Sequence, residues 1–127
     1  MGAAASAVPT FDADALARYD RHLRLAQVGT AGQHRLMASR VVLVGAGGLG
    51  SPAAFYLAAA GVGTLVIIDD DRVERSNLQR QILHTDAAVG SPKVVSARER
   101  LLALNPRLRV EGVEARLLPE NVEALLS

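Results

Sequence analysis

The sequence has 127 residues, of which 50% are hydrophobic and 21% are charged, and its formal net charge is +1. This length suits one globular domain and is too short for two. Because the chain has no cysteine, the composition excludes disulfides, thiolate metal sites and a cysteine nucleophile. The 14 basic and 13 acidic residues nearly balance and are scattered, so neither nucleic acid nor a membrane surface is indicated as a partner.

Residues 1–12 are predicted to form a flexible tail, followed by one domain over residues 13–127. The start, Met1–Ser6, fits a minimal myristoylation pattern, but the Ala-rich composition favours a chance match. A secretory signal is disfavoured because no basic start or leucine-rich stretch comes before Pro9 and Asp12. The expected location is therefore the cytoplasm.

The first predicted element is one amphipathic helix that starts at Asp14. Its inner face carries apolar residues at helical spacing (Leu16, Tyr19, Leu23 and Ala26). Gly29 and Gly32 break the pattern, and a short helical turn is expected around residues 34–38.

Between Arg40 and Asp69 lie 28 consecutive uncharged residues, a length that could suggest a membrane span. The run contains six glycines and a proline, and its two aliphatic blocks, residues 41–44 and 65–68, are short and mainly β-branched. Such blocks are typical of buried parallel strands, and the Ala-rich segment 53–60 between them has the length of a crossover helix that ends at Gly61. The run is therefore predicted to be a buried βαβ unit, which makes the domain α/β.

The remaining elements follow a long polar loop over residues 72–85. A helix is expected from an N-cap at Ser91 and a first residue at Pro92 to about Leu104. Its predicted inner face consists of Val94, Ala97, Leu101 and Leu104. A third strand is expected over residues 108–115 with a bulge at Gly112, and Pro119 and Glu120 are expected to open a final helix.

A glycine-rich loop, residues 45–50, follows the first predicted strand and opens the crossover helix, and Asp69 comes 19 residues after its last glycine. Glycines let a phosphate or adenosine approach the backbone, the helix N-terminus offers free N–H groups, and an acid can accept hydrogen bonds from a ribose. The sequence therefore predicts a nucleotide site. The alternative is that the glycines serve packing and that Asp69 begins a solvated strand end, an interpretation that we keep for Asp70 and Asp71.

The stretch Ser76–Gln81 places amides and a guanidinium shortly after this acid, where they could hold a triphosphate; the alternative is an exposed polar loop. Lys93 is the single lysine of the chain, and it sits in the first turn of a predicted helix, where a cation opposes the helix dipole. This placement favours an anionic target, although chance remains open. The three histidines lack ligand spacing, and no Walker lysine motif follows any glycine run.

These motifs, in this order, closely resemble the adenylyltransferases that activate ubiquitin-like sulfur carriers, namely the molybdopterin-synthase and thiamine-biosynthesis enzymes, which are related to ubiquitin-activating enzymes. The resemblance covers residues 14–127 and includes Arg18–His22 and Gly90–Lys93 in addition to the motifs above. It implies ATP, with Mg²⁺, as the cofactor and a sulfur-carrier protein ending in Gly-Gly as the partner.

The resemblance also implies roles for individual residues. Gly45, Gly47 and Gly48 would approach ATP, and Asp69 would bind its ribose. Asn77, Arg80 and Lys93 would hold the phosphates. Arg80 and Lys93 would also be catalytic, together with Arg21, which would reach into the partner's site of a homodimer.

Family members continue with a fourth strand carrying an aspartate for Mg²⁺, a crossover loop that often holds a cysteine, and frequently a four-cysteine zinc site, none of which is in this sequence. We therefore expect no metal ligand within it, and a Rossmann-like, doubly wound parallel sheet reduced to its first three strands, in the order 3-2-1, before strand 4. Two alternatives stay open: an NAD(P)-binding module of an oxidoreductase, and an interaction fragment without catalysis.

Overall fold

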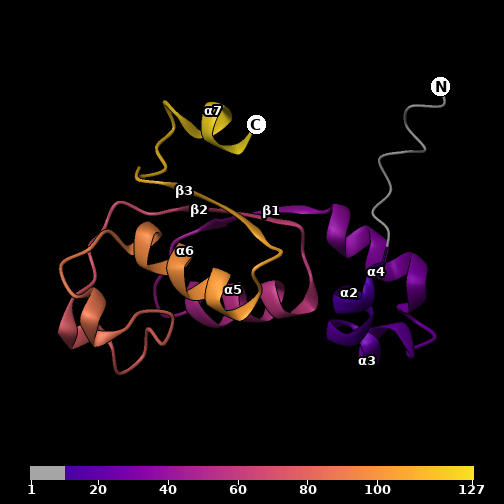
Figure 1. Ribbon diagram of the computed structural model, residues 1–127. Helices are drawn as coiled ribbons and strands as arrows, with labels where there is room; N and C mark the ends of the chain where they lie inside the picture. Colours follow the sequence, from indigo (N-terminus) through magenta and orange to yellow (C-terminus); the bar gives the residue numbers. More distant parts are fainter. Residues whose placement is uncertain (1–10) are drawn as a thin grey trace.

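Three parallel strands form one sheet in the order β1-β2-β3, which is the expected 3-2-1 arrangement. The computed structural model describes residues 11–127 (Figure 1). β1 (Arg40–Val44) pairs along its whole length with β2 (Thr64–Ile68), and β2 pairs with β3 (Arg109–Val113). β1 is an edge strand among the described residues, and the predicted Rossmann-like α/β architecture is confirmed.

The helices lie around this sheet in three groups (Figure 1). α5 (Gly50–Ala60) and α6 (Lys93–Leu104) cover one face, and the short α7 (Val122–Leu126) lies on the other. Within residues 11–127, the helices α2 (Ala13–Arg18), α3 (Asp20–Leu23) and α4 (Gly29–Ala38) gather where β1 begins. The carboxyl ends of the strands, where ligands bind in open α/β sheets, therefore face away from the N-terminal helices.

The core lies between the sheet and helices α5 and α6. Residues 65–68 of the central strand β2 are all buried. Two of them, Leu65 and Ile67, pack in one cluster with small or aliphatic residues on the two helices, including Ala54 and Ala58 of α5 and Ala97 and Leu101 of α6. Burying one aliphatic side chain of this size stabilises a fold by about 1.5–3 kcal/mol, and the small alanines let the helices approach the sheet closely.

The prediction of a single N-terminal helix from Asp14 is wrong, because the structure divides this segment at Tyr19 into α2 and α3. Tyr19 has φ −105° and ψ 16°, and its side chain is buried. Its hydroxyl accepts a hydrogen bond from Asn105 Nδ2 at 3.0 Å, a tertiary contact that outweighs the local periodicity. Gly29, which was expected to break the helical pattern, is the first residue of α4 and has φ +59°. Instead of the expected short turn around residues 34–38, α4 is therefore a helix of ten residues.

The expected start of α6 is also wrong, since Pro92 is the N-cap and Lys93 is the first helical residue. The segment before α6 is held extended because Pro92 forms an antiparallel bridge with Arg72 and the Ser91 carbonyl accepts from Val73 N–H at 2.8 Å. At the other end of the helix Leu104 is 42% exposed, so its expected inward placement is wrong as well.

β3 is shorter than expected and pairs in an unbroken register, so the bulge expected at Gly112 is absent among its described pairs. Gly112 pairs with Ile67, and a Cβ on it would lie 3.1 Å from Val94 Cβ of α6. The glycine therefore permits close helix packing. α7 begins at Val122 rather than at Pro119, after Asn121 Oδ1 has accepted Leu118 N–H at 2.8 Å in the preceding turn.

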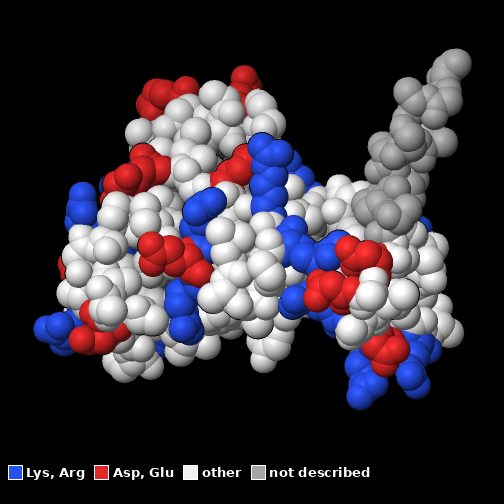
Figure 2. Space-filling view, viewed as in Figure 1, with Lys and Arg blue, Asp and Glu red and all other residues white. Residues whose placement is uncertain are grey.

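The uncharged run folds as β1, α5 and β2, which confirms the predicted βαβ unit. Within residues 11–127, no helix has the length and apolar character needed to cross a membrane. Most of the expected tail, including the myristoylation-like start, lies outside the described residues. Asp12, at its predicted end, is the N-cap of α2 and accepts Ala15 N–H at 2.9 Å. On the face drawn in Figure 2, acidic and basic side chains are interspersed.

Candidate functional site

The glycine-rich loop connects the carboxyl end of β1 to the N-terminus of α5. Gly45 adopts φ +100°, which favours glycine, and its N–H donates to the Ile68 carbonyl at 2.8 Å. A Cβ on Gly50 would collide with the Gly45 carbonyl oxygen, so this tight turn requires glycine at position 50. These two glycines are explained by the fold alone.

Gly47 and Gly48 have no such internal reason to be glycine. Neither has a positive φ. A Cβ on Gly48 would meet no heavy atom within 4 Å, and one on Gly47 would make only an ordinary contact, 3.5 Å from Gln81 Nε2. The bare backbone therefore borders open space, as a nucleotide approaching the main chain requires.

Asp69 lies beside this loop, where the sequence predicted it. Its Oδ2 accepts Ala46 N–H at 2.8 Å and its Oδ1 accepts Asp71 N–H at 2.7 Å. Each carboxylate oxygen keeps one further lone pair, so the side chain can still accept hydrogen bonds from ribose hydroxyls. Asp69 thus also fastens the glycine loop to the end of β2, a role that the sequence did not reveal.

The polar loop contains a short 3₁₀ turn, η1 (Arg75–Asn77), and it carries two of the predicted phosphate ligands, Asn77 and Arg80. Arg80 Nη2 donates to Asn77 Oδ1 at 3.1 Å, so these two side chains are already paired. Arg80 is exposed, whereas Gln81 is buried next to Gly47. The polar loop therefore contacts the glycine-rich loop through Gln81 and not through the guanidinium of Arg80.

Lys93 is buried at the first position of α6, with only 5% of its surface exposed. Its side-chain Nζ lies 3.6 Å from Asp71 Oδ2, and its backbone N–H donates to the Asp71 carbonyl at 2.9 Å. Burying a cation where it also opposes a helix dipole costs free energy that one exposed carboxylate offsets only in part. The sequence identified Lys93 but missed Asp71, which it treated as part of a solvated strand end.

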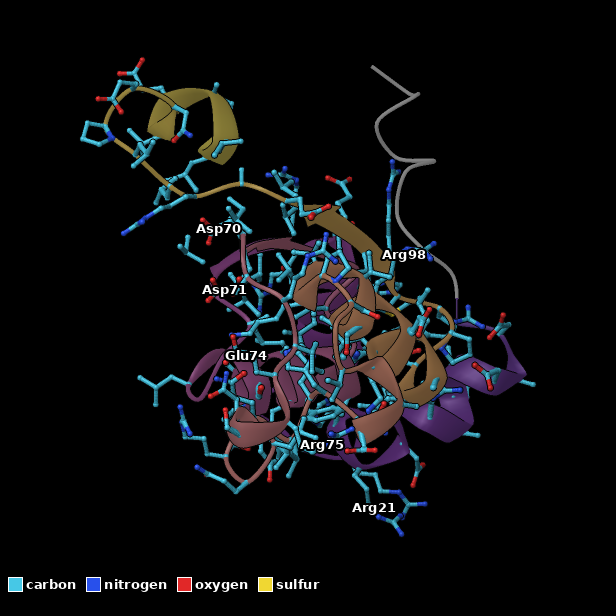
Figure 3. The ribbon with its side chains drawn as sticks, turned by 90° about the vertical axis from the view of Figure 1, so that its left-hand side faces the viewer. Arg21, Asp70, Asp71, Glu74, Arg75 and Arg98 are labelled. Carbon is cyan, nitrogen blue, oxygen red and sulfur yellow. The ribbon has the colours of Figure 1, made fainter. Side chains whose placement is uncertain are left out.

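Arg21 is not brought to the site within one chain. Its side chain is 88% exposed and pairs with Asp20 at 2.9 Å. Figure 3 shows it at the bottom of the molecule, well apart from Asp70 and Asp71 at the end of β2. Any contact with a nucleotide would therefore have to be made in a second copy of the chain.

His84 lies directly beneath the glycine loop, although the sequence marked it only as an isolated histidine. It is 5% exposed, and its two ring nitrogens contact the Ala46 carbonyl oxygen (2.8 Å) and Ser96 Oγ (2.7 Å). Burial lowers the pKa of its imidazole, and the cations of Lys93 and Arg100 act in the same direction. No periodic pattern in a polar loop could have identified this residue.

Two cavities in the described part of the chain contain none of these residues. One of about 400 Å³ is lined by Tyr19, Met37 and Asn105, and another of similar volume lies between α6 and β3. A third, of about 290 Å³, is lined in part by Ser96, the partner of His84. The candidate site itself is open at Gly48. The carboxylates of Asp69, Asp70 and Asp71 lie within 4.8 Å of one another, but backbone N–H groups hold the first and Lys93 faces the third. These contacts account for Asp69 and Asp71.

The ThiF family model matches residues 19–127. The chain belongs to the ThiF family. It is 56% identical over 118 residues to the SAMP-activating enzyme E1 of Haloferax volcanii, covering 93% of this chain and 44% of that protein. It is 53% identical over 111 residues to the sulfur carrier protein adenylyltransferase of Thermus thermophilus, covering 87% and 41%.

The chain is also similar to solved structures. The Escherichia coli tRNA N6-threonylcarbamoyladenosine dehydratase TcdA, solved in complex with ATP, matches with a TM-score of 0.86 and 31% identity, covering 93% of this chain and 48% of that one. This ThiF-family chain therefore spans less than half the length of the relatives named here.

Proposed function

We propose that this ThiF-family chain is the ATP-binding part of an adenylyltransferase that activates the C-terminal glycine carboxylate of a ubiquitin-like sulfur-carrier protein. Two relatives more than 50% identical to it are named as an E1 activating enzyme and a sulfur-carrier adenylyltransferase. The carriers of molybdopterin synthase and of thiamine biosynthesis are the candidate substrates.

The observation that carries the proposal is the bare backbone of Gly47 and Gly48, flanked by Asp69 and close to a buried lysine. A small loop without side chains fits a nucleotide, and the carboxylate beside it fits a ribose. A buried ammonium group fits the phosphates, because phosphate oxygens would supply the negative charge that Asp71 supplies only in part. The residues present therefore suit ATP.

In the proposed reaction the carboxylate oxygen of the carrier attacks the α-phosphorus of ATP in line. The bond between the α-phosphorus and the bridging oxygen breaks, and pyrophosphate leaves with that electron pair. No general base is needed, since the attacking carboxylate is already ionised at neutral pH. The chain contributes positioning and charge neutralisation, which dominate catalysis of such transfers.

We assign the phosphates to Asn77, Arg80 and Lys93, with Gly45 and the two bare glycines against the nucleotide. Mg²⁺ would accompany ATP, but we do not assign the three aspartates after β2 to it, because Asp69 is directed at the glycine loop and Asp71 at Lys93. Arg21 would act on the site of the second chain in a homodimer, where an arginine stabilises charge on the α-phosphate.

The test is ATP–pyrophosphate exchange by the full-length protein with a carrier that ends in Gly-Gly. Exchange should require the carrier, and it should vanish when the two glycines are removed from the carrier. Exchange absent with every carrier of this class, from a protein that binds ATP, would refute the proposed substrate.

The glycine loop and Asp69 also suit NAD(P), the second candidate, because dinucleotide-binding folds use the same two features. An NAD(P)-binding module does not need the polar side chains of Asn77, Arg80 and Lys93. Calorimetry distinguishes the candidates: we expect heat of binding with ATP and none with NAD⁺ or NADP⁺, and the reverse result would favour an oxidoreductase module.

A further inference from the structure

The ring of His84 forms a hydrogen bond to one peptide group of the glycine-rich loop, the one that contains the Ala46 carbonyl. A backbone carbonyl can only accept a hydrogen bond, so the nitrogen that faces Ala46, Nε2, must carry the proton. In a neutral imidazole Nδ1 is then the acceptor, and Ser96 Oγ–H donates to it at 2.7 Å. Ser96 is 2% exposed, so its hydroxyl has this buried ring nitrogen as its partner, and the Ala46 carbonyl determines the tautomer.

The two sides of Ala46 are held by different parts of the molecule. Its N–H donates to Asp69 Oδ2 at 2.8 Å, and its carbonyl accepts from His84 Nε2 at 2.8 Å. Asp69 follows β2, whereas His84 ends the polar loop and rests on α6 through Ser96. The peptide group between Ala46 and Gly47 therefore cannot rotate without breaking a buried hydrogen bond.

This anchoring determines where the next N–H points. A peptide bond is planar and trans, so its C=O and N–H point in opposite directions. Because the Ala46 carbonyl points down to His84, the Gly47 N–H points away from His84. Within residues 11–127 no group accepts that N–H, and the space above Gly48 is open.

We propose that His84 is a positioning residue of the nucleotide site: as the neutral Nε2–H tautomer it anchors the Ala46 carbonyl and thereby presents the Gly47 N–H to a phosphate or ribose oxygen. This inference rests on the proposed ATP binding. His84 touches no ligand itself and acts through the loop.

Burial favours the neutral form of His84. Burial, the main cause, and the nearby cations of Lys93 and Arg100 lower the pKa of His84, while the Ala46 carbonyl and the Asp69 carboxylate oppose this shift. Since the folded-state pKa lies below the ordinary value of about 6.5, the stability that the neutral imidazole gives the fold is fully present above that pH and is lost as the pH falls through the folded-state pKa. Protonation of Nδ1 keeps the Nε2–H donor to Ala46, makes the Ser96 hydroxyl an acceptor instead of a donor, and adds a buried charge beneath the loop.

The experiment measures ATP affinity at pH 7.5 for the wild-type protein and three variants. His84→Gln keeps an amide N–H near the position of Nε2 but cannot be protonated, and His84→Leu removes the donor. His34→Gln is the matched control, because His34 packs against Phe11 away from the glycine loop.

We expect His84→Leu to weaken ATP binding at pH 7.5 by about tenfold or more, His84→Gln by less than about threefold, and His34→Gln not at all. Wild-type affinity in His84→Leu would overturn the inference. Ser96→Ala replaces His84→Leu if the latter fails to fold, with an intermediate loss expected.

Nitrogen NMR of the histidine rings separates this inference from the proposed function. If the wild type binds no ATP, the proposed function fails, and the anchor is judged by the spectrum alone. A protonated Nε2, a bare Nδ1 and a Gly47 amide signal that moves as His84 titrates support the anchor. The opposite tautomer, or a Gly47 signal that ignores this titration, overturns it.

Discussion

The ammonium nitrogen of Lys93 lies 3.6 Å from Asp71 Oδ2, while the Asp71 carbonyl accepts the Lys93 backbone N–H at 2.9 Å. The first residue of α6 is therefore fixed to the end of β2 through both its main chain and its side chain. The lysine is nearly buried, but the side chain of its partner is 68% exposed, so solvent screens the pair strongly. Lys93 is thus a cation whose charge is incompletely balanced by the chain.

Replacement of Lys93 by methionine should leave the protein folded and remove adenylation. The apolar side chain fills a similar volume, and the carboxylate left without its partner, Asp71, is 68% exposed and stays solvated. Exchange activity in the full-length protein should fall by at least about 100-fold, as for loss of a group that stabilises transition-state charge. Arg98→Ala, which removes an exposed cation from the same helix, is the control and should retain activity.

The energetic link between Lys93 and Asp71 can be measured by a double-mutant cycle. Because Asp71 is mostly exposed, we expect Asp71→Asn and Lys93→Met to couple by less than about 1 kcal/mol in urea unfolding. Saturating ATP should reduce that coupling, since phosphate oxygens take the place of the carboxylate. Asp70→Asn, which changes an exposed neighbour, should show no coupling with Lys93→Met. A coupling well above this bound, or one unchanged by ATP, contradicts this account.

The sequence predicted the sheet well because the signals there are local and repeated. Two short β-branched blocks, a glycine turn and an acid after the second block were enough to place β1, α5, β2 and Asp69. The helix ends were predicted less well. Tyr19 interrupts a periodic helix for a hydrogen bond to Asn105, which is 86 residues away in the sequence, and no local pattern encodes that distance.

The candidate site was predicted from residue types but not from their internal contacts. Lys93 was conspicuous as the single lysine in the chain, whereas Asp71 and His84 were not, because an acid at a strand end and a histidine in a polar loop are ordinary in a sequence. Their roles arise from tertiary contacts: Asp71 meets the start of α6, and His84 meets a carbonyl 38 residues earlier.

The glycine loop offers a contrast between glycines that serve the fold and glycines that serve a ligand. Gly50→Ala places a methyl group against the Gly45 carbonyl, so it should lower the free energy of unfolding by about 1–3 kcal/mol or more. Gly48→Ala meets open space and should change that free energy by less than about 1 kcal/mol. ATP affinity should nevertheless fall about tenfold or more in Gly48→Ala. Unfolding curves and calorimetry on the same samples check both statements, and unchanged affinity in Gly48→Ala would remove the reason for assigning the nucleotide to this loop.

Arg21 lies away from the site of its own chain, so its proposed action on a partner can be tested by mixing two inactive proteins. Arg21→Ala and Lys93→Met should each abolish exchange. If Arg21 acts across a homodimer, a mixed dimer contains one complete site, with Lys93 from one chain and Arg21 from the other. Random mixing in equal amounts should therefore restore about a quarter of the wild-type exchange activity. Recovery near zero after verified subunit exchange would mean that Arg21 does not complement its partner, and its catalytic assignment would have to be withdrawn.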